Sequence, residues 1–279
     1  MVKMGIFEAL IMGLVQGLTE FLPVSSSGHL VIFGEILGLH MADGNAFAVF
    51  LHLATFISVC VVYYKDIIEL IKEFFLMIAD ICRGRFDFKR PYRRMLIMLI
   101  IATIPAVVLG FVFKMFDIDT KLSNLLVVGF MLLITAALMF VVDKFNRNAF
   151  DASNAKYGSS FMVGLAQACA LMPGLSRSGS TITAARALGY KKEFAIKFSF
   201  LMSLPAILGA AALEGAGLIR DGGFSVEALP LAVGFIAAAV SGVLAIKFLI
   251  NLLNKNKFYF FSIYCAIAGI LSIVFGFIK

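Results

Sequence analysis

The sequence predicts an all-α integral membrane protein whose two halves form an inverted-topology repeat. Of its 279 residues, 61% are hydrophobic and 15% are charged, whereas soluble domains contain about 45–50% apolar and about 25% charged residues. Two polar turns, Ser25–His29 and Ser176–Ser180, recur at an offset of 151 residues within this apolar sequence. A repeated polar loop of this kind is typical of membrane proteins that build one site from two halves.

Six apolar runs are long enough, at roughly 20 residues each, to cross a bilayer as helices. They lie at about 45–64, 95–113, 123–142, 194–213, 229–250 and 258–278.

Four shorter apolar pieces flank the two polar turns in pairs. They lie at about 5–22, 28–39, 159–172 and 179–190. Backbone that leaves the helix at membrane depth is tolerated only inside protein or in a water-filled cavity. We therefore expect each pair to form a re-entrant hairpin with its turn near the midplane. Pro23 and Pro173-Gly174 are expected to end the first helix of each hairpin, because proline lacks an N–H and disfavours helical geometry in the preceding residue.

The distribution of basic residues predicts the orientation. The segment 65–94 contains eight Lys and Arg residues, whereas 114–122 contains two and 214–228 contains one. By the positive-inside rule, 65–94 is cytoplasmic and both termini lie outside. Within 65–94, Asp66 to Asp80 has the pattern of a helix along the interface. The first hairpin then opens to the outside and the second to the inside, which makes the repeat inverted.

The repeat boundaries follow from these spans. We expect repeat A at about 1–142 and repeat B at about 155–279 of a single membrane domain, 1–279. The net charge of +7 comes from short loops between spans, which argues against a nucleic-acid partner. The four cysteines are scattered and indicate neither a disulfide framework nor a zinc site.

The polar residues of the hairpins are the candidates for chemistry, because charged groups at membrane depth usually face a cavity or a partner. Gln16 and Glu20 are four residues apart, so a helix places both on one face. Arg177 provides a planar, permanently charged fork for phosphate oxygens. The backbone N–H groups of the helices after Gly28 and Gly179 are expected to form anion sites.

The first turn adds a nucleophile and a base. Ser26 near His29 fits a hydroxyl activated by an imidazole, and the carboxylate of Glu20 can hold a divalent cation that neutralises phosphate charge. Together these groups favour phosphoryl chemistry on a lipid-borne phosphate. Further phosphate contacts are expected from Ser25, Ser27, Gly28, Ser176, Ser178, Gly179, Thr181 and Gln16.

Two less specific interpretations compete with this one. Turns rich in Ser and Gly also serve as close-packing devices in membrane proteins, although the charged groups beside these turns favour a site. His52, inside the run 45–64, fits a hydrogen-bonded packing histidine better than a site residue.

At these residues the chain resembles the undecaprenyl-pyrophosphate phosphatase family, which is also known for bacitracin resistance. The first motif is GLTEFLPVSSSGH, from Gly17 to His29, and the second is PGLSRSGST, from Pro173 to Thr181. Both motifs are highly specific. The similarity covers essentially the full length, including FSFLMSLP from Phe198 to Pro205.

The resemblance implies a bacterial inner-membrane enzyme with an inverted repeat and an active site that faces outside. It would hydrolyse the C55 isoprenoid pyrophosphate to the monophosphate carrier of wall synthesis plus phosphate, with Mg²⁺ or Ca²⁺ as cofactor. Prenyl length, the choice of cation and the oligomeric state, homodimer included, stay open.

The resemblance also assigns roles. Glu20 is implied as the essential carboxylate and metal ligand, Ser26 as the nucleophile, His29 as its base or acid, and Arg177 as the pyrophosphate clamp. Many members carry Glu where this chain has Gln16. A neutral amide cannot act as an acid or base, so Gln16 is expected only as a ligand or hydrogen-bond partner. Direct attack by water, activated by Glu20 or His29, is the alternative to a phosphoserine intermediate.

Two other functions are compatible with parts of the sequence. Phosphatidic-acid-phosphatase enzymes share a Ser-Gly-His element but need a second histidine after their Ser-Arg motif, and all three histidines here precede residue 53. A transporter or flippase of a polyprenyl phosphate lipid fits the inverted repeat with broken helices equally well. The sequence leaves that alternative open.

Overall fold

The computed structural model describes residues 4–39, 46–85, 87, 89–116, 118–145, 148–220, 227–253 and 258–278. These residues form helices and contain no strand, so the predicted all-α class is confirmed for them. The helices are α1 (Ile6–Phe21), α2 (Ser26–Leu37), α3 (Ala46–Val62), α4 (Tyr64–Cys82), α5 (Pro91–Phe116), α6 (Ile118–Leu122), α7 (Leu125–Val142), α8 (Tyr157–Cys169), α9 (Arg177–Ala187), α10 (Lys192–Arg220), α11 (Ala228–Leu253) and α12 (Tyr259–Ile278).

Five of these helices are each long and apolar enough to cross a membrane, as far as the described residues go: α5, α7, α10, α11 and α12. They coincide with five of the six predicted spans. The sixth, 45–64, corresponds to α3, which has 17 residues and meets α4 at a bend of 89°. Only together do α3 and α4 satisfy the requirements of a span. The chain is therefore a helical, multi-pass membrane protein.

The four short apolar pieces are also helices. They form α1, α2, α8 and α9, with 16, 12, 13 and 11 residues. Each is shorter than the roughly 20 residues that a span needs. Within each pair the two helices contact one another, so the polar turn between them lies at the end of a compact helical hairpin.

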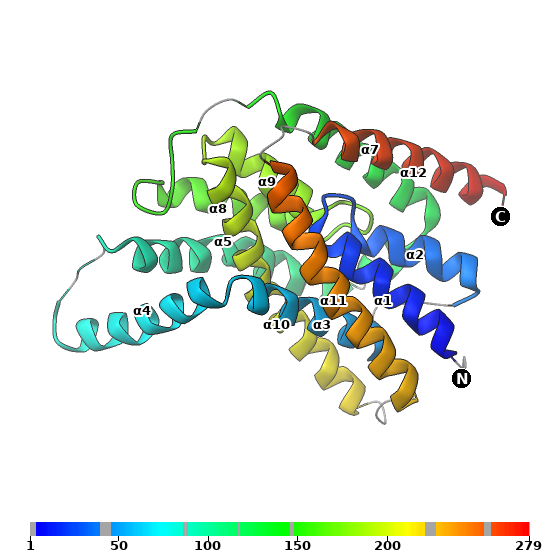
Figure 1. The fold of residues 1–279 in the computed structure, drawn as a ribbon, viewed down its shortest axis with the longest axis horizontal. Helices are drawn as coiled ribbons and strands as arrows, with labels where there is room; N and C mark the ends of the chain where they lie inside the picture. Colours follow the sequence, from blue (N-terminus) through cyan, green and yellow to red (C-terminus); the bar gives the residue numbers. More distant parts are fainter. Residues whose placement is uncertain are drawn as a thin grey trace.

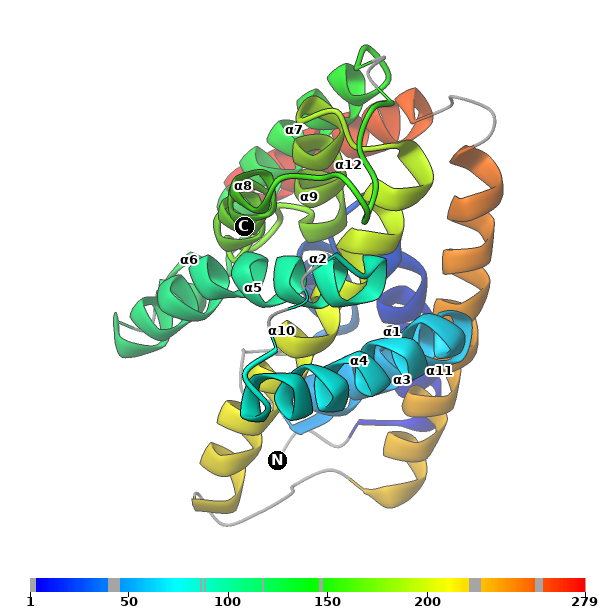
Figure 2. The same ribbon diagram turned by 90° about the vertical axis from the view of Figure 1, so that its left-hand side faces the viewer.

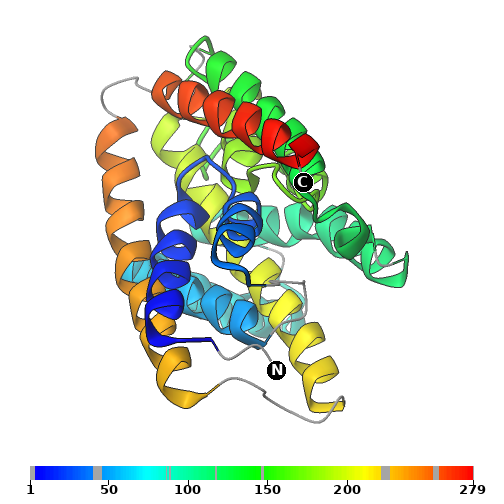
Figure 3. The same ribbon diagram turned by 90° about the vertical axis from the view of Figure 1, so that its right-hand side faces the viewer.

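The hairpins pack on helices from the opposite half of the chain. α1 lies along α11 and α8 lies along α5 (Figures 1 and 3). Glycine makes both approaches close, because a Cβ on Gly17 would lie 2.1 Å from Ser241 Oγ and one on Gly164 would lie 2.2 Å from the Ala102 carbonyl oxygen. Small residues of this kind let membrane helices gain van der Waals contact over their backbones.

The outer helices face away from this core. α7 and α12 pair along one edge of the molecule (Figure 1), and α4 lies against α5 at another (Figure 2). Only 22% of the apolar stretch of α12 and 28% of that of α5 are buried. Their exposed side chains include Phe111 and Phe277. In a bilayer such surfaces face lipid.

Candidate functional site

The two polar turns have the same local construction. Ser25 caps α2 and Ser176 caps α9, and each hydroxyl accepts a hydrogen bond from the amide three residues later, that of Gly28 or Gly179, at 3.3 and 3.1 Å. Serine is favoured at this position because its oxygen satisfies one of the free amides of the first helical turn. Ser25 has a φ of 70°, which is uncommon for a residue other than glycine.

The capped geometry corrects the predicted anion sites. The helices begin at Ser26 and Arg177, before rather than after the glycines. Because the caps take up the third amide of each helix, the amides of the first two residues are the ones directed toward an anion. Likewise α8 ends at Cys169, before Pro173-Gly174, and Gly174 takes a φ of +91° in the turn that follows.

The two turns touch. The Gly174 amide donates to Ser27 Oγ at 3.3 Å, and Ser178 Oγ donates to the Leu22 carbonyl at 3.2 Å. A Cβ on Gly28 would lie only 3.1 Å from the Gly174 Cα. Residues some 150 positions apart therefore form one continuous polar region.

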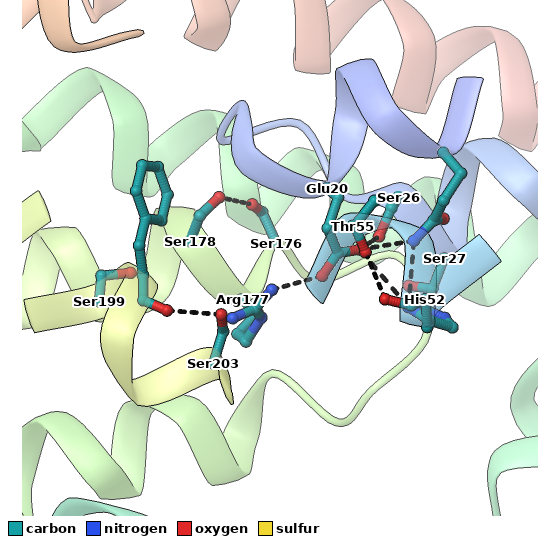
Figure 4. Close-up of polar contacts among 12 residues, drawn as sticks. Glu20, Ser26, Ser27, His52, Thr55, Ser176, Arg177, Ser178, Ser199 and Ser203 are labelled. Atoms are coloured by element: carbon teal, nitrogen blue, oxygen red, sulfur yellow. Dashed lines mark hydrogen bonds and ion pairs between the residues drawn. The ribbon is translucent and has the colours of Figure 1, made fainter. Parts of the chain in front are cut away.

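Glu20 is the centre of this region. It lies on the last turn of α1 and is 7% exposed. Arg177 donates to one carboxylate oxygen, while Ser26 Oγ and Gln16 Nε2 donate to the other at 2.5 and 3.0 Å. Figure 4 shows Glu20 between Arg177 and Ser26. A buried carboxylate is thus compensated by a cation and two hydrogen bonds, as burial of a charge requires.

The predicted pair of Ser26 and His29 is not formed. His29 Nδ1 donates to the Ser25 carbonyl at 2.7 Å, and its Nε2 accepts from the hydroxyl of Tyr264 at 2.6 Å. Both ring nitrogens are therefore used, and the buried imidazole stacks on the Tyr264 ring of α12. The hydrogen-bond acceptor of the Ser26 hydroxyl is the Glu20 carboxylate instead.

His52 lies at the site, which the sequence interpretation did not favour. Its Nδ1 is 3.0 Å from Gln16 Nε2 and 3.8 Å from a Glu20 oxygen. The sequence contains one indication of this position. The offset of 151 residues that relates the two turns also relates His52 to the polar Ser203, and Phe47 to Phe198, so the repeat continues into the helix that contains His52.

The predicted phosphate contacts differ in exposure. Ser26, Ser27 and Arg177 are partly exposed, so a ligand can reach them. Buried members make hydrogen bonds within the protein, as Thr181 does by donating to the Arg177 carbonyl and contacting Ser199 Oγ at 2.6 Å. The buried members of the predicted set are Gln16, Ser25, Gly28, Ser176, Ser178, Gly179 and Thr181.

The donors present fit a divalent cation that is shared with a ligand. The described residues contain no cluster of three His, Cys, Asp or Glu side chains. They do provide the Glu20 carboxylate and, beside it, Gln16 Oε1, a buried oxygen without a hydrogen-bond partner. Mg²⁺ is commonly held by one or two carboxylates plus substrate phosphates. A cation here would therefore take most of its ligands from phosphate and water.

The arrangement contains the groups that phosphoryl transfer needs. That reaction depends mainly on positioning and on electrostatic stabilisation of the transferred group. Arg177 and the helix amides provide positive potential, Ser26 provides a hydroxyl, and Glu20 lies within proton-transfer distance of it.

Comparison with known proteins places the chain in a family. The family model described as Bacitracin resistance protein BacA matches residues 9–271. A protein named undecaprenyl-diphosphatase from Methanobrevibacter smithii is 44% identical over 273 residues, 96% of this chain and 96% of that protein. Proteins of the same name from Bacteroides fragilis and Alkaliphilus metalliredigens are 44% and 41% identical over 272 residues each. They cover 96% and 97% of this chain, and 97% and 98% of their own lengths.

The match extends through both polar turns and through four of the five long apolar helices, ends within α12, and covers far more than half of the sequence. The relatives are similar over almost their whole length, so the likeness is not confined to one motif. The chain belongs to the bacitracin resistance protein BacA family.

Proposed function

We propose that this protein hydrolyses undecaprenyl diphosphate to undecaprenyl phosphate and phosphate, which recycles a lipid carrier of wall synthesis and gives resistance to bacitracin. The name shared by relatives that cover nearly the whole chain supports this activity. The observation that carries it is the contact chain Arg177–Glu20–Ser26, in which a cation, a carboxylate and a hydroxyl meet at two helix N-termini.

The reaction begins with the pyrophosphate held by Arg177 and by the first amides of α2 and α9. Ser26 Oγ attacks the terminal phosphorus, and its proton passes to the Glu20 oxygen 2.5 Å away. The bond to the bridging oxygen breaks, and undecaprenyl phosphate leaves with that electron pair. Water then attacks the phosphorus of the phosphoserine, the bond to Ser26 Oγ breaks, Oγ regains its proton from Glu20, and phosphate leaves together with one proton of the water. In the alternative scheme, Glu20 accepts the proton of a water that attacks the phosphorus directly.

A divalent cation would be held by Glu20 and Gln16 Oε1 together with the substrate. Its chemistry when bound is to offset the charge of the pyrophosphate oxygens. The uncompensated oxygen of Gln16 supports this assignment.

A groove lined by apolar residues supports a lipid-borne substrate. It has a volume of about 710 Å³ and lies between α4, α5 and α10. Leu201 and Leu204 line its α10 wall on either side of Ser203, the position that the offset relates to His52. The groove offers a hydrocarbon chain an apolar path beside the helix that borders the site.

The inverted repeat and the re-entrant hairpins belong to the same proposal. Under the 151-residue offset α1 corresponds to α8, and the two pack on α11 and α5, respectively. This reciprocal packing supports two halves of opposite orientation.

With 65–94 in the cytoplasm, the first hairpin opens outward and hydrolysis takes place at the external face of the inner membrane. The exposed Cys82 at the end of α4 should then react with an impermeant maleimide only in inside-out vesicles.

Purified protein tests the activity directly. With C15 or C55 diphosphate and Mg²⁺ in detergent, the wild type should release phosphate and Arg177→Ala should not. Lys191→Ala is the matched control, because it removes a cation of the same half of the chain that pairs with Asp151 in an exposed loop.

The result also separates the enzyme from a carrier. Absence of phosphate release from any diphosphate lipid, combined with saturable transfer of such a lipid across vesicle membranes, would overturn the proposal. Phosphate release that persists in Arg177→Ala would remove Arg177 from its role.

A further inference from the structure

His52 has a polar environment that the mechanism above leaves unexplained. It comes from α3, and its Nδ1 lies 3.0 Å from Gln16 Nε2 on α1. Its side chain is 36% exposed, whereas the Glu20 side chain beside it is 5% exposed. A packing histidine of an apolar helix would be expected inside the core. This one combines a buried polar partner with an open edge.

The hydrogen bonds define which way the Gln16 amide points. Glu20, paired with Arg177, is an acceptor at both oxygens, so the Gln16 atom 3.0 Å from it must be the NH₂ nitrogen. With the amide reversed, two oxygens would face one another at hydrogen-bond distance. The orientation is therefore fixed by Glu20 and not by His52.

The Gln16 amide in turn fixes the His52 ring. One of its hydrogens goes to Glu20 and the other points at His52 Nδ1. Nδ1 must accept that hydrogen bond, so the ring hydrogen is on Nε2. Nε2 lies across the ring from Gln16, so its N–H points away from the Gln16–Glu20 pair, and the ring that carries it is partly exposed.

The second half of the chain has a polar side chain at the corresponding place. The offset of 151 residues relates His52 to Ser203 on α10, and α3 and α10 pack together. Figure 4 shows His52 near the Ser26 end of the contact chain and Ser203 near the Arg177 end. Ser203 is buried and its hydroxyl donates to the Phe200 carbonyl at 2.6 Å, so of these two side chains the partly exposed His52 is the one that a ligand at the turns can reach.

We propose that the Nε2–H of His52 binds a pyrophosphate oxygen, and that Gln16 acts as a positioning residue that holds this N–H toward the substrate. The assignment rests on the proposed function. It also accounts for the neutral amide at position 16. A carboxylate there would accept a hydrogen from Nδ1 and turn the Nε2 lone pair toward the phosphates.

Steady-state kinetics with C15 diphosphate test the contact. His52→Leu should raise KM about tenfold, the effect of losing one hydrogen bond to a charged group, with kcat changed less than KM. His52→Gln keeps an acceptor for Gln16 and an NH₂ donor for phosphate, so its KM should stay within about threefold of wild type. Cys60→Ala, about two turns along the same helix, is the matched control and should leave both constants unchanged.

A spectroscopic test reports on the tautomer without relying on turnover. The chain has three histidines, so ¹⁵N-labelled imidazole spectra can be assigned with single variants. His52 should have its hydrogen on Nε2, and inorganic pyrophosphate should shift that nitrogen. Gln16→Glu should move the hydrogen to Nδ1 and raise KM.

The outcomes are distinguishable. If Arg177→Ala abolishes phosphate release but His52→Leu has the KM of wild type, or if the hydrogen is on Nδ1 in the wild type, the assignment of His52 is wrong and the proposed function stands. If the wild type releases no phosphate from any diphosphate lipid, the proposed function fails with it. Should His52→Leu not fold, the imidazole spectra of the wild type with and without pyrophosphate still decide.

Discussion

Arg177 donates a hydrogen bond to Glu20 across 157 positions of the sequence, from the first residue of α9 to the last turn of α1. Each side chain compensates the charge of the other, with 18% and 5% of their surfaces exposed. We expect an incoming pyrophosphate to compete with Glu20 for the guanidinium, which would couple binding of the substrate to release of the carboxylate.

Glu20→Gln should reduce kcat about 10²- to 10⁴-fold, because the proton acceptor of Ser26 is lost. KM should change less than kcat, since Arg177 is freed to bind phosphate while one ligand of the cation is lost. Phosphate release at several substrate concentrations separates the two constants. Glu8→Gln, on the first turn of the same helix, is the control. A kcat within tenfold of wild type in Glu20→Gln would remove this residue from proton transfer.

Ser26→Ala should lose at least about 10²-fold in turnover if the phosphoserine scheme holds. The wild type, quenched in acid after reaction with terminally ³²P-labelled substrate, should retain label on serine. Ser27→Ala, which removes the acceptor of the Gly174 amide, should retain labelling. Near-normal turnover of Ser26→Ala would leave attack by water as the mechanism.

Mg²⁺ should bind weakly to the protein alone and far more tightly together with a non-hydrolysable diphosphonate. The physical reason is that Glu20 and Gln16 supply too few ligands for a cation without phosphate. Titration calorimetry with and without the analogue measures this difference. Chelation should abolish turnover yet leave the thermal unfolding midpoint unchanged. Saturable, tight Mg²⁺ binding without analogue would contradict the shared site.

Gly17→Ala should destabilise the protein by about 1–3 kcal/mol, the usual cost of overpacking. The new methyl group would lie 2.1 Å from Ser241 Oγ and 2.3 Å from the Ala238 carbonyl oxygen. Gly209→Ala is the matched control, because nothing lies within 4 Å of a Cβ there. In thermal unfolding experiments in detergent, Gly17→Ala should have a lower midpoint temperature than the wild type, and Gly209→Ala should not. Equal midpoints for all three proteins would mean that α1 and α11 can separate at little cost.

Tyr264→Phe should lower stability by about 1–3 kcal/mol, the cost of leaving a buried acceptor unpaired. The lost hydroxyl donates to Nε2 of His29, which is 3% exposed. The exposed Tyr259 on the same helix provides the control variant Tyr259→Phe. If both variants unfold at the temperature of wild type, the imidazole has another partner in solution.

The positions of most helices were predictable from the sequence. Apolar length predicted the five long spans, and Pro23 predicted the end of α1 at Phe21. Pro173 did not mark the end of α8. That helix ends at Cys169, because the residues that follow close a series of tight turns, one of them by a bond from the Leu175 amide to the Met172 carbonyl.

Contacts between distant segments were not predictable in the same way. Proximity in sequence suggested that Ser26 and His29 form a pair, but His29 binds Tyr264, 235 positions away, and Ser26 reaches back over the turn to Glu20. The position of His52 beside Gln16 was not predictable for the same reason. Its surroundings in sequence are apolar, and its partner Gln16 is on another helix.

The reciprocal packing of α1 on α11 and of α8 on α5 means that each half of the chain supplies one turn of the site. Two separate, identical half-chains would bring two identical turns together, either both with Ser26 or both with Arg177. A site with one acidic and one basic partner needs halves that differ and yet always occur in equal number. Covalent fusion guarantees that ratio, so the peptide link between the halves keeps one acidic and one basic turn in every molecule.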